Sequence, residues 1–240
     1  MKVLVGCEQS GIVCGAFRDR GHKAYSCDLL PPAKTHRYAR YHLKCDVREQ
    51  IGYDWDLFIV HPDCTYLCAS GLHWNKRGAL VDGRPRAELT EEALDFVREM
   101  MDSSAHIPRF CLENSRGCIG TRITPKTQTI QPFQFGHDAS KTTDLWLDGL
   151  PKLVGTTFVP PRLVCGGCGA HLDYAAYVGP CAWVVNCEHC GAGPGLFKPR
   201  WANQTDSGQN KLGPSADRWM LRAETYTGIA EAMADQWGST

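Results

Sequence analysis

The chain has 240 residues with 26 basic and 26 acidic side chains, and 43% of its residues are hydrophobic. This composition is typical of one packed medium domain, or of one domain with a small inserted module, and it excludes a disordered chain, a fibre and a coiled coil. Because the net charge is zero, any binding to nucleic acid has to come from local basic patches. No apolar run reaches the ~20 residues that span a bilayer, and the N-terminus lacks a signal peptide, so we expect a cytoplasmic protein with no membrane partner.

The first half of the chain alternates between strand and helix patterns. Residues 65–89 look like a long loop, and Thr90 can cap the helix that follows it. The alternation predicts an α/β fold with a mostly parallel sheet and helices on both faces. The hydrophobic periodicity gives strands at residues 2–6, 23–27, 43–47, 56–60 and 109–112, and helices at residues 11–20 and 90–105.

Four polar residues lie at or just beyond the ends of the expected strands: Asp28, Asp46, Cys64 and Glu113. In open parallel sheets, ligands bind at the carboxyl ends of the strands. We therefore expect these four side chains to line one site.

The pattern changes after residue 115. Strand-like pieces are expected at residues 131–135 and 144–147, and an amphipathic helix at residues 225–237. The loop-rich residues 151–211 hold two close pairs of cysteines. The sequence thus divides into a core of residues 1–150, a small module of residues 151–211, and a C-terminal segment of residues 212–240 that completes the core.

The paired cysteines predict a metal site. Thirteen cysteines without a secretion signal indicate free thiols or metal ligands rather than disulfides. Two CxxC pairs separated by 18 residues match a zinc ribbon, with Zn²⁺ held structurally because four thiolates fill its coordination shell. Gly169 and Gly191 follow the pairs and allow a left-handed turn. The four ligands are Cys165, Cys168, Cys187 and Cys190.

Taken in order, these residues resemble the DNA cytosine-5 methyltransferases, in a compact form common among phages, over residues 2–147 and 214–237. The resemblance implies a Rossmann-like sheet that binds S-adenosylmethionine (SAM). It assigns Asp28 to the ribose and Asp46 to the adenine amino group. The turn after the first strand would cradle SAM, although the family usually has glycine in place of Gln9; its residues are Cys7, Glu8, Gln9 and Gly11.

The segment from His61 to Thr65 resembles the Pro-Cys loop that carries the nucleophile of the family, and it assigns Pro62 to the cofactor pocket. Attack of the Cys64 thiolate on C6 of cytosine makes C5 nucleophilic, so that C5 takes a methyl group from the sulfonium. Loss of the C5 proton then expels the thiolate. The family usually has proline before this cysteine, whereas this chain has Asp63, whose carboxylate is expected to raise the pKa of the thiol.

Glu113 and Asn114 resemble the Glu-Asn pair of the family. A carboxyl group there can bind N3 and the exocyclic amine of cytosine, which stabilises the charge that develops on C6 attack and rejects thymine. The resemblance also assigns Asn114, Gln134 and Lys141 to the substrate base. We further expect Arg77, in the basic segment of residues 65–89, to contact DNA.

The implied partner is double-stranded DNA, from which the cytosine must be flipped. The zinc module is expected to read the target sequence, and the oligomeric state stays open. Two alternatives also stay open. The same fold and covalent chemistry could add another one-carbon unit to pyrimidine C5, or act on uracil or RNA. Alternatively, the chain could be a zinc-bearing DNA-binding protein without catalytic activity.

Overall fold

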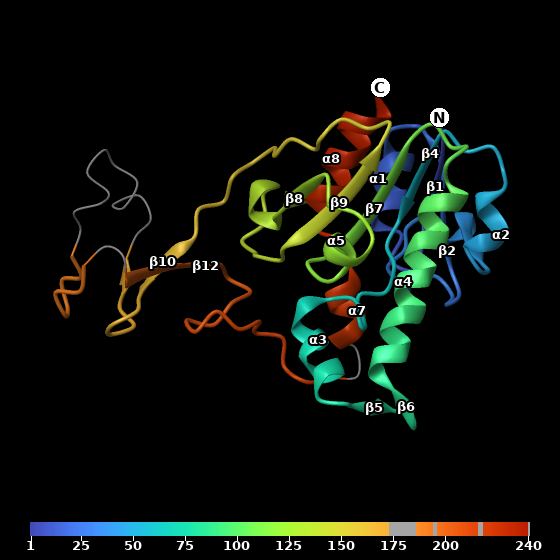
Figure 1. Cartoon of the computed structure of the whole chain (residues 1–240). Coiled ribbons are helices and arrows are strands. Elements are labelled where there is room, and N and C mark those ends of the chain that lie inside the picture. The colour runs from blue at the N-terminus through green and yellow to red at the C-terminus, as the bar shows by residue number, and fades with distance from the viewer. Residues whose placement is uncertain (173–185, 194–195, 216–217, 240) are drawn as a thin grey trace. The chain divides into compact units, whose positions relative to one another are not determined.

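The computed structural model describes residues 1–172, 186–193, 196–215 and 218–239 (Figure 1). The chain forms two compact units. The first comprises Met1–Ile130, Thr142–Val154 and Ala223–Thr240, and the second comprises Gln131–Lys141 and Gly155–Arg222. None of the helices in these described stretches is both long and apolar enough to cross a membrane.

A seven-stranded sheet forms the centre of the first unit, in the order β3-β2-β1-β4-β7-β9-β8. Strands β1, β2, β3, β4 and β7 are parallel, and β9 runs antiparallel to both β7 and β8. This confirms the predicted α/β fold with a mostly parallel sheet. The strands are β1 (Lys2–Gly6), β2 (Lys23–Asp28), β3 (His42–Lys44), β4 (Leu57–Val60), β7 (Phe110–Ser115), β8 (Gln128–Ile130) and β9 (Thr143–Asp148).

Helices flank this sheet: in Figure 1, α4 (Arg86–Ser103) crosses in front of it, and α1 (Ile12–Asp19) and α8 (Thr227–Gly238) lie behind it. The buried residues Leu94, Val97 and Met100 recur at helical spacing on α4, so they share one side of the helix. They pack in one cluster with Leu4 and Phe58 of the sheet. Helices α1 and α8 pack against each other. Shorter helices are η1 (Ala39–Tyr41), α2 (Arg48–Ile51), α5 (Ile119–Arg122) and α7 (Arg218–Ala223).

The prediction of a long loop at residues 65–89 was wrong. This segment folds into α3 (Ala69–Lys76) and a hairpin of β5 (Leu80–Val81) and β6 (Arg84–Pro85), and α4 already begins at Arg86. Buried Arg86 donates to Asn75 Oδ1 (2.7 Å) and to the Thr65 carbonyl (2.5 Å). Thr90 does not cap the helix: its hydroxyl accepts from Asn75 Nδ2 (2.9 Å) and donates to the Tyr66 carbonyl (3.0 Å). Polar contacts rather than a hydrophobic period order this segment.

Three other expectations need correction. Residues 131–135 form no strand but a 3₁₀ turn, η2 (Pro132–Gln134), because Pro132 has no N–H for a sheet. Strand β3 ends at Lys44, before Asp46, and β7 continues through Glu113 to Ser115. The first strand and helix, the strand at residues 144–147 and the C-terminal helix are confirmed as β1, α1, β9 and α8.

The second unit contains a three-stranded sheet in the order β11-β10-β12. Its strands are β11 (His171–Leu172), β10 (Arg162–Cys165) and β12 (Phe197–Arg200), with both neighbours antiparallel to β10. Elsewhere in this unit, Phe133 stacks on Trp201 with ring centroids 4.2 Å apart. The Trp201 indole N–H donates to the Val159 carbonyl (3.1 Å). The stack therefore joins η2 to the segments on either side of the small sheet.

Candidate functional site

The loop that carries Cys64 is tied to the end of the neighbouring strand. It follows β4, and β7 lies beside β4 with Val60 paired to Leu112. Beyond that pair, three successive side chains of β7 contact the loop. Glu113 Oε2 lies 2.6 Å from His61 Nδ1, Asn114 Nδ2 donates to the Pro62 carbonyl (2.7 Å), and the Ser115 side chain hydrogen-bonds to the Cys64 thiol.

The His61–Glu113 pair is sheltered from solvent, with side chains only 12% and 11% exposed. Because water screens the pair little, the interaction between the two groups is stronger than on a surface. Sequence reasoning missed His61 and Ser115 as site residues. His61 begins the recognised cysteine segment, and Ser115 lies two residues after Glu113. Only the register of β4 against β7 brings His61 to Glu113 and Ser115 to Cys64.

The Cys64 thiol lies in an environment that opposes ionisation. A hydrogen bond with the Cys68 thiol, burial and the Asp63 carboxylate raise the pKa of Cys64 far above the ordinary value, while the hydrogen bond with Ser115 lowers it. The Asp63 carboxylate therefore raises the pKa of Cys64 as expected, but the Cys68 thiol raises it more. Asp63 itself folds into a turn, since its Oδ1 accepts from the Thr65 N–H (2.9 Å) and hydroxyl (2.7 Å). At neutral pH Cys64 is a thiol.

A second group of acids surrounds the turn after β1. Cys7 there has a left-handed backbone (φ 57°). Burial, together with the carboxylates of Asp28, Asp46 and Asp63, raises the pKa of its thiol to about 12. Residues from the ends of β2, β3 and β4 thus lie within electrostatic range of one turn. This turn lies where the strand order reverses, between β1 and β4, which is where open α/β sheets bind ligands.

Two residues assigned to that turn have structural roles. The buried Glu8 carboxylate accepts from the N–H groups of Val13 (2.6 Å) and Cys14 (3.1 Å), so it caps α1. Burial raises the pKa of Glu8 to about 7. Gly11 has φ 68°, and a Cβ there would lie 2.2 Å from the His36 ring. The space beside Gly11 is therefore filled by this chain, and the glycine serves the turn itself.

The side chains of Gln9, Asp28 and Asp46 also have partners within the chain. Gln9 Nε2 donates to the Pro31 carbonyl (3.0 Å), and Asp28 Oδ1 accepts from the Leu30 N–H (2.9 Å). Asp46 accepts from both the backbone N–H (3.0 Å) and the guanidinium (2.9 Å) of Arg48. Asp28 and Asp46 meet at one edge as expected, with Asp46 held in an ion pair.

The remaining substrate candidates also have partners within the chain. Gln134 and Lys141 belong to the second unit, where Gln134 Oε1 accepts from the Gln131 N–H (2.8 Å) and Lys141 Nζ donates to the Arg222 carbonyl (2.8 Å). Arg77 follows α3, and its guanidinium lies 5.3 Å from the centre of the exposed Trp74 ring.

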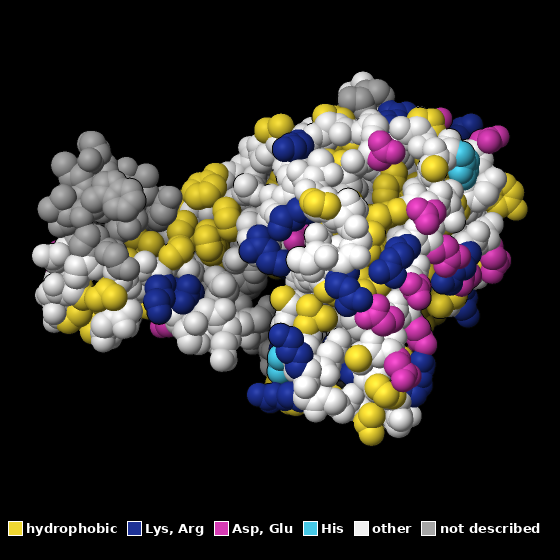
Figure 2. All heavy atoms as spheres, in the orientation of Figure 1, with side chains coloured by type: hydrophobic (Ala, Val, Ile, Leu, Met, Phe, Trp, Pro, Cys, Tyr) yellow, Lys and Arg dark blue, Asp and Glu magenta, His cyan; other side chains and the backbone are white. Residues whose placement is uncertain are grey.

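Basic and acidic groups are mixed on the surface of the first unit. Figure 2 shows Lys and Arg side chains interspersed with Asp and Glu side chains around α4. Acidic groups of this helix pair with arginines of several elements, in the pairs Arg48–Glu99, Arg84–Glu92, Arg98–Asp95 and Arg122–Glu91. Of the basic segment expected to contact DNA, Arg84 is thus ion-paired and Arg86 is buried.

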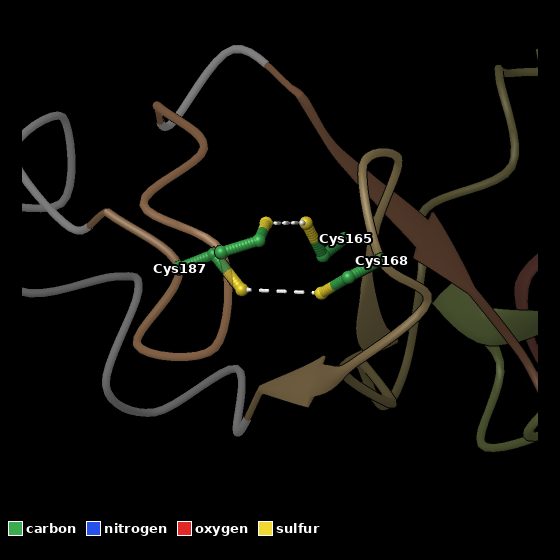
Figure 3. Close-up of side chains that lie close together, drawn as sticks. Cys165, Cys168 and Cys187 are labelled. Atoms are coloured by element: carbon green, nitrogen blue, oxygen red, sulfur yellow. Dashed lines mark hydrogen bonds between the residues drawn. The ribbon is translucent and has the colours of Figure 1, made fainter.

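The four paired cysteines converge on one point of the second unit (Figure 3). Their sulfur atoms all lie within 4.8 Å of one another. Cys165 and Cys190 sulfurs are 3.7 Å apart, and Cys168 and Cys187 sulfurs are 3.6 Å apart. Four sulfurs at ~2.3 Å around a tetrahedral zinc lie about 3.8 Å apart, which is close to the two distances above, so the cluster could hold a metal ion such as zinc.

The two CxxC pairs form the same knuckle. Cys165 N–H donates to the Ala170 carbonyl and Cys187 N–H to the Ala192 carbonyl, both at 2.8 Å. Gly169 and Gly191 have φ 76° and 70°, which confirms the expected left-handed turns. The N–H groups of Cys168 and Gly167 lower the pKa of Cys165 to about 7, and so favour the thiolate that a metal requires.

No protein-family model matches the chain, and no match was found among curated proteins. What the chain does therefore has to be inferred from its two groups of residues. The first unit brings a thiol, a carboxyl group and an imidazole to adjacent strand ends, beside an acidic turn. The second unit offers four thiolates to one metal ion.

Proposed function

We propose that the chain is a SAM-dependent methyltransferase that methylates C5 of cytosine in DNA through a covalent bond between Cys64 and C6. One observation carries this proposal: the loop with Cys64 is tied to β7 at Glu113 and Asn114, through the contacts of His61 and Pro62. A nucleophile and an acid so placed can act on neighbouring atoms of one ring.

The sheet supports a nucleoside cofactor. Its five parallel strands follow the order third, second, first, fourth, fifth, as in the first five strands of a Rossmann sheet. Asp28 and the backbone of residues 7–9 would hold SAM at the point where that order reverses. The residues around the turn fit SAM. Asp28 offers a carboxylate to the ribose hydroxyls, and the negative charges of Asp28, Asp46 and Asp63 complement a sulfonium cation. When bound, SAM supplies an electrophilic methyl group.

Cys64 would add to C6 of the pyrimidine. Its proton has to pass to solvent water as the S–C6 bond forms, and the Ser115 hydrogen bond lowers the pKa of the thiol and so stabilises the thiolate. Addition breaks the conjugation of the ring and gives C5 the electron pair with which it takes up the methyl group. Loss of the C5 proton then restores the double bond and releases the Cys64 thiolate.

Glu113 would bind the opposite edge of the same ring. A protonated carboxyl donates from one oxygen to N3 and accepts from the exocyclic amine with the other. Donation to N3 stabilises the negative charge that develops there when C6 is attacked. The sheltered position of Glu113, with its side chain 11% exposed, strengthens this effect because little water competes.

The DNA contacts and the metal complete the proposal. Trp74 and Arg77, exposed at α3, supply an aromatic ring and a cation next to the segment that carries the nucleophile. The second unit would read the target sequence, with Zn²⁺ as the structural ion. Among the described residues, its knuckles share a small cluster of four buried residues, which a bound metal would stabilise.

A covalent trap tests this function. An oligonucleotide duplex with one 5-fluorocytosine blocks the loss of the C5 proton, so wild-type protein with SAM should form a stable adduct of one chain per duplex. Cys64→Ala should form none. Cys68→Ala is the matched control: it should keep the adduct and form it faster, because the largest cause of the raised Cys64 pKa is gone. An adduct in Cys64→Ala, or none in the wild type, would refute the proposal.

A further inference from the structure

His61 lies directly beside the proposed acid. The last paired residues of β4 and β7 are Val60 and Leu112, and the next residue of each strand supplies one member of the pair. His61 Nδ1 and Glu113 Oε2 are 2.6 Å apart, and both side chains are nearly buried. A hydrogen bond at this distance fixes which oxygen of the carboxyl group faces the imidazole ring.

The loop cannot easily turn His61 away from Glu113. The residue after His61 is held through its carbonyl by Asn114 (2.7 Å). The His61 N–H donates to the Gly6 carbonyl (3.0 Å), so the backbone on the other side is fixed by β1. The imidazole is thus fixed between β1 and β7.

Two carboxyl groups lie near the imidazole ring. Glu113 Oε2 contacts Nδ1, and buried Glu8 lies within electrostatic range of the ring. The oxygen of Glu113 that faces Nδ1 keeps lone pairs whether the carboxyl group is charged or neutral, so an Nδ1–H has an acceptor there. The nitrogen next to Glu113 is therefore expected to donate rather than accept.

The direction of this hydrogen bond matters for base choice. Cytosine presents an acceptor at N3 and a donor at its amine, whereas uracil presents a donor at N3 and an acceptor at O4. A carboxyl group matches cytosine only when one oxygen accepts and the other carries the proton. If Oε2 already accepts from His61, the proton of a neutral Glu113 belongs on Oε1.

We propose that His61 is a positioning residue that donates its Nδ1–H to Oε2 of Glu113, so that Oε1 presents its proton to N3 and the site selects cytosine over uracil. This inference rests on the proposed function and deepens it. His61 touches neither the reacting atoms nor SAM in this role, and it acts only through Glu113.

Two substitutions at position 61 test the inference. His61→Asn keeps an N–H donor close to the position of Nδ1, and His61→Leu removes the donor at similar volume. Methyl transfer is measured on duplexes that differ only in a single cytosine or uracil, with KM and kcat determined separately. His61→Leu should lose about tenfold in kcat on cytosine, as expected for the loss of one buried hydrogen bond, and the preference for cytosine should fall by a similar factor. His61→Asn should restore most of both.

The positioning role would be overturned if His61→Asn had no higher kcat or cytosine preference than His61→Leu, or if His61→Leu kept the wild-type base preference. Either result would leave the proposed methyltransferase function intact. ¹⁵N NMR of the histidine rings in the wild type gives a readout that needs neither activity nor a stable variant. A protonated, hydrogen-bonded Nδ1 at His61 supports the inference, and a bare Nδ1 overturns it. A wild type that neither methylates nor traps any pyrimidine would instead refute the proposed function and the role of His61 in reading the base.

Discussion

Gly117 lies where the segment after Cys64 crosses the end of β7, and replacing it with alanine should displace that segment. A Cβ at this position would lie 1.9 Å from the Leu67 carbonyl oxygen and 2.9 Å from Cys68 Cα. Both are backbone atoms, so no side chain can rotate out of the way. The crossing is held by hydrogen bonds from Ala69 N–H to the Arg116 carbonyl (2.9 Å) and from Cys118 N–H to the Leu67 carbonyl (3.0 Å).

The size of the effect follows from these distances. Real Cβ atoms stay at least 3.0 Å from other heavy atoms, so the Leu67 carbonyl has to move by about 1 Å. Such a shift breaks both crossing hydrogen bonds, at about 1 kcal/mol each, and overpacking adds about 1–3 kcal/mol. Gly117→Ala should therefore lower the free energy of unfolding by about 3–5 kcal/mol. Because Cys68 N–H donates to the Cys64 carbonyl (2.9 Å), the nucleophile should move too.

Gly120→Ala is the matched control, three residues away in α5, where a Cβ meets nothing within 4 Å. It should be neutral or stabilise the helix by up to about 1 kcal/mol. Urea unfolding measures both variants, and hydrogen exchange of the Ala69 and Cys118 amides reports on the crossing itself. If Gly117→Ala unfolds at the same urea concentration as Gly120→Ala and keeps both amides protected, the steric argument is wrong.

Two further predictions concern the metal and the cap of α1. Purified protein should contain about one zinc per chain, and Cys187→Ser should lose it while Cys68→Ala keeps it; elemental analysis showing well under one zinc in the wild type would contradict the metal centre. Because burial raises the pKa of Glu8 from 4.5 to about 7, its contribution to stability is complete below pH 4.5 and is lost as the pH rises through 7. The unfolding free energy of the wild type relative to Glu8→Gln should therefore fall by about 3 kcal/mol over this range, and a difference that does not vary with pH would show that Glu8 does not titrate.

Local sequence signals predicted those parts of the fold that depend on neighbours in the chain. Apolar runs predicted β1 and β4, and helical periodicity predicted α1 and α8. The order of strands and helices along the chain predicted a mostly parallel sheet. The CxxC spacing, with Gly169 and Gly191, gave both metal knuckles, because each closes through hydrogen bonds within six residues. The segment of residues 65–89 was misread, since Arg86, Asn75 and Thr90 order it through polar contacts that leave no hydrophobic period.

By itself, the sequence determined which chemical groups follow the strand ends, because a strand and the residue after it are contiguous in the chain. Only the tertiary structure decided what those groups do next to one another. Glu8 faces the N-terminus of α1, Asp46 is held by Arg48, and the Cys64 thiol is hydrogen-bonded to Cys68. The alignment of β4 with β7 brings His61 to Glu113 across 52 residues of chain, and this pairing depends on strand register, which no local pattern encodes.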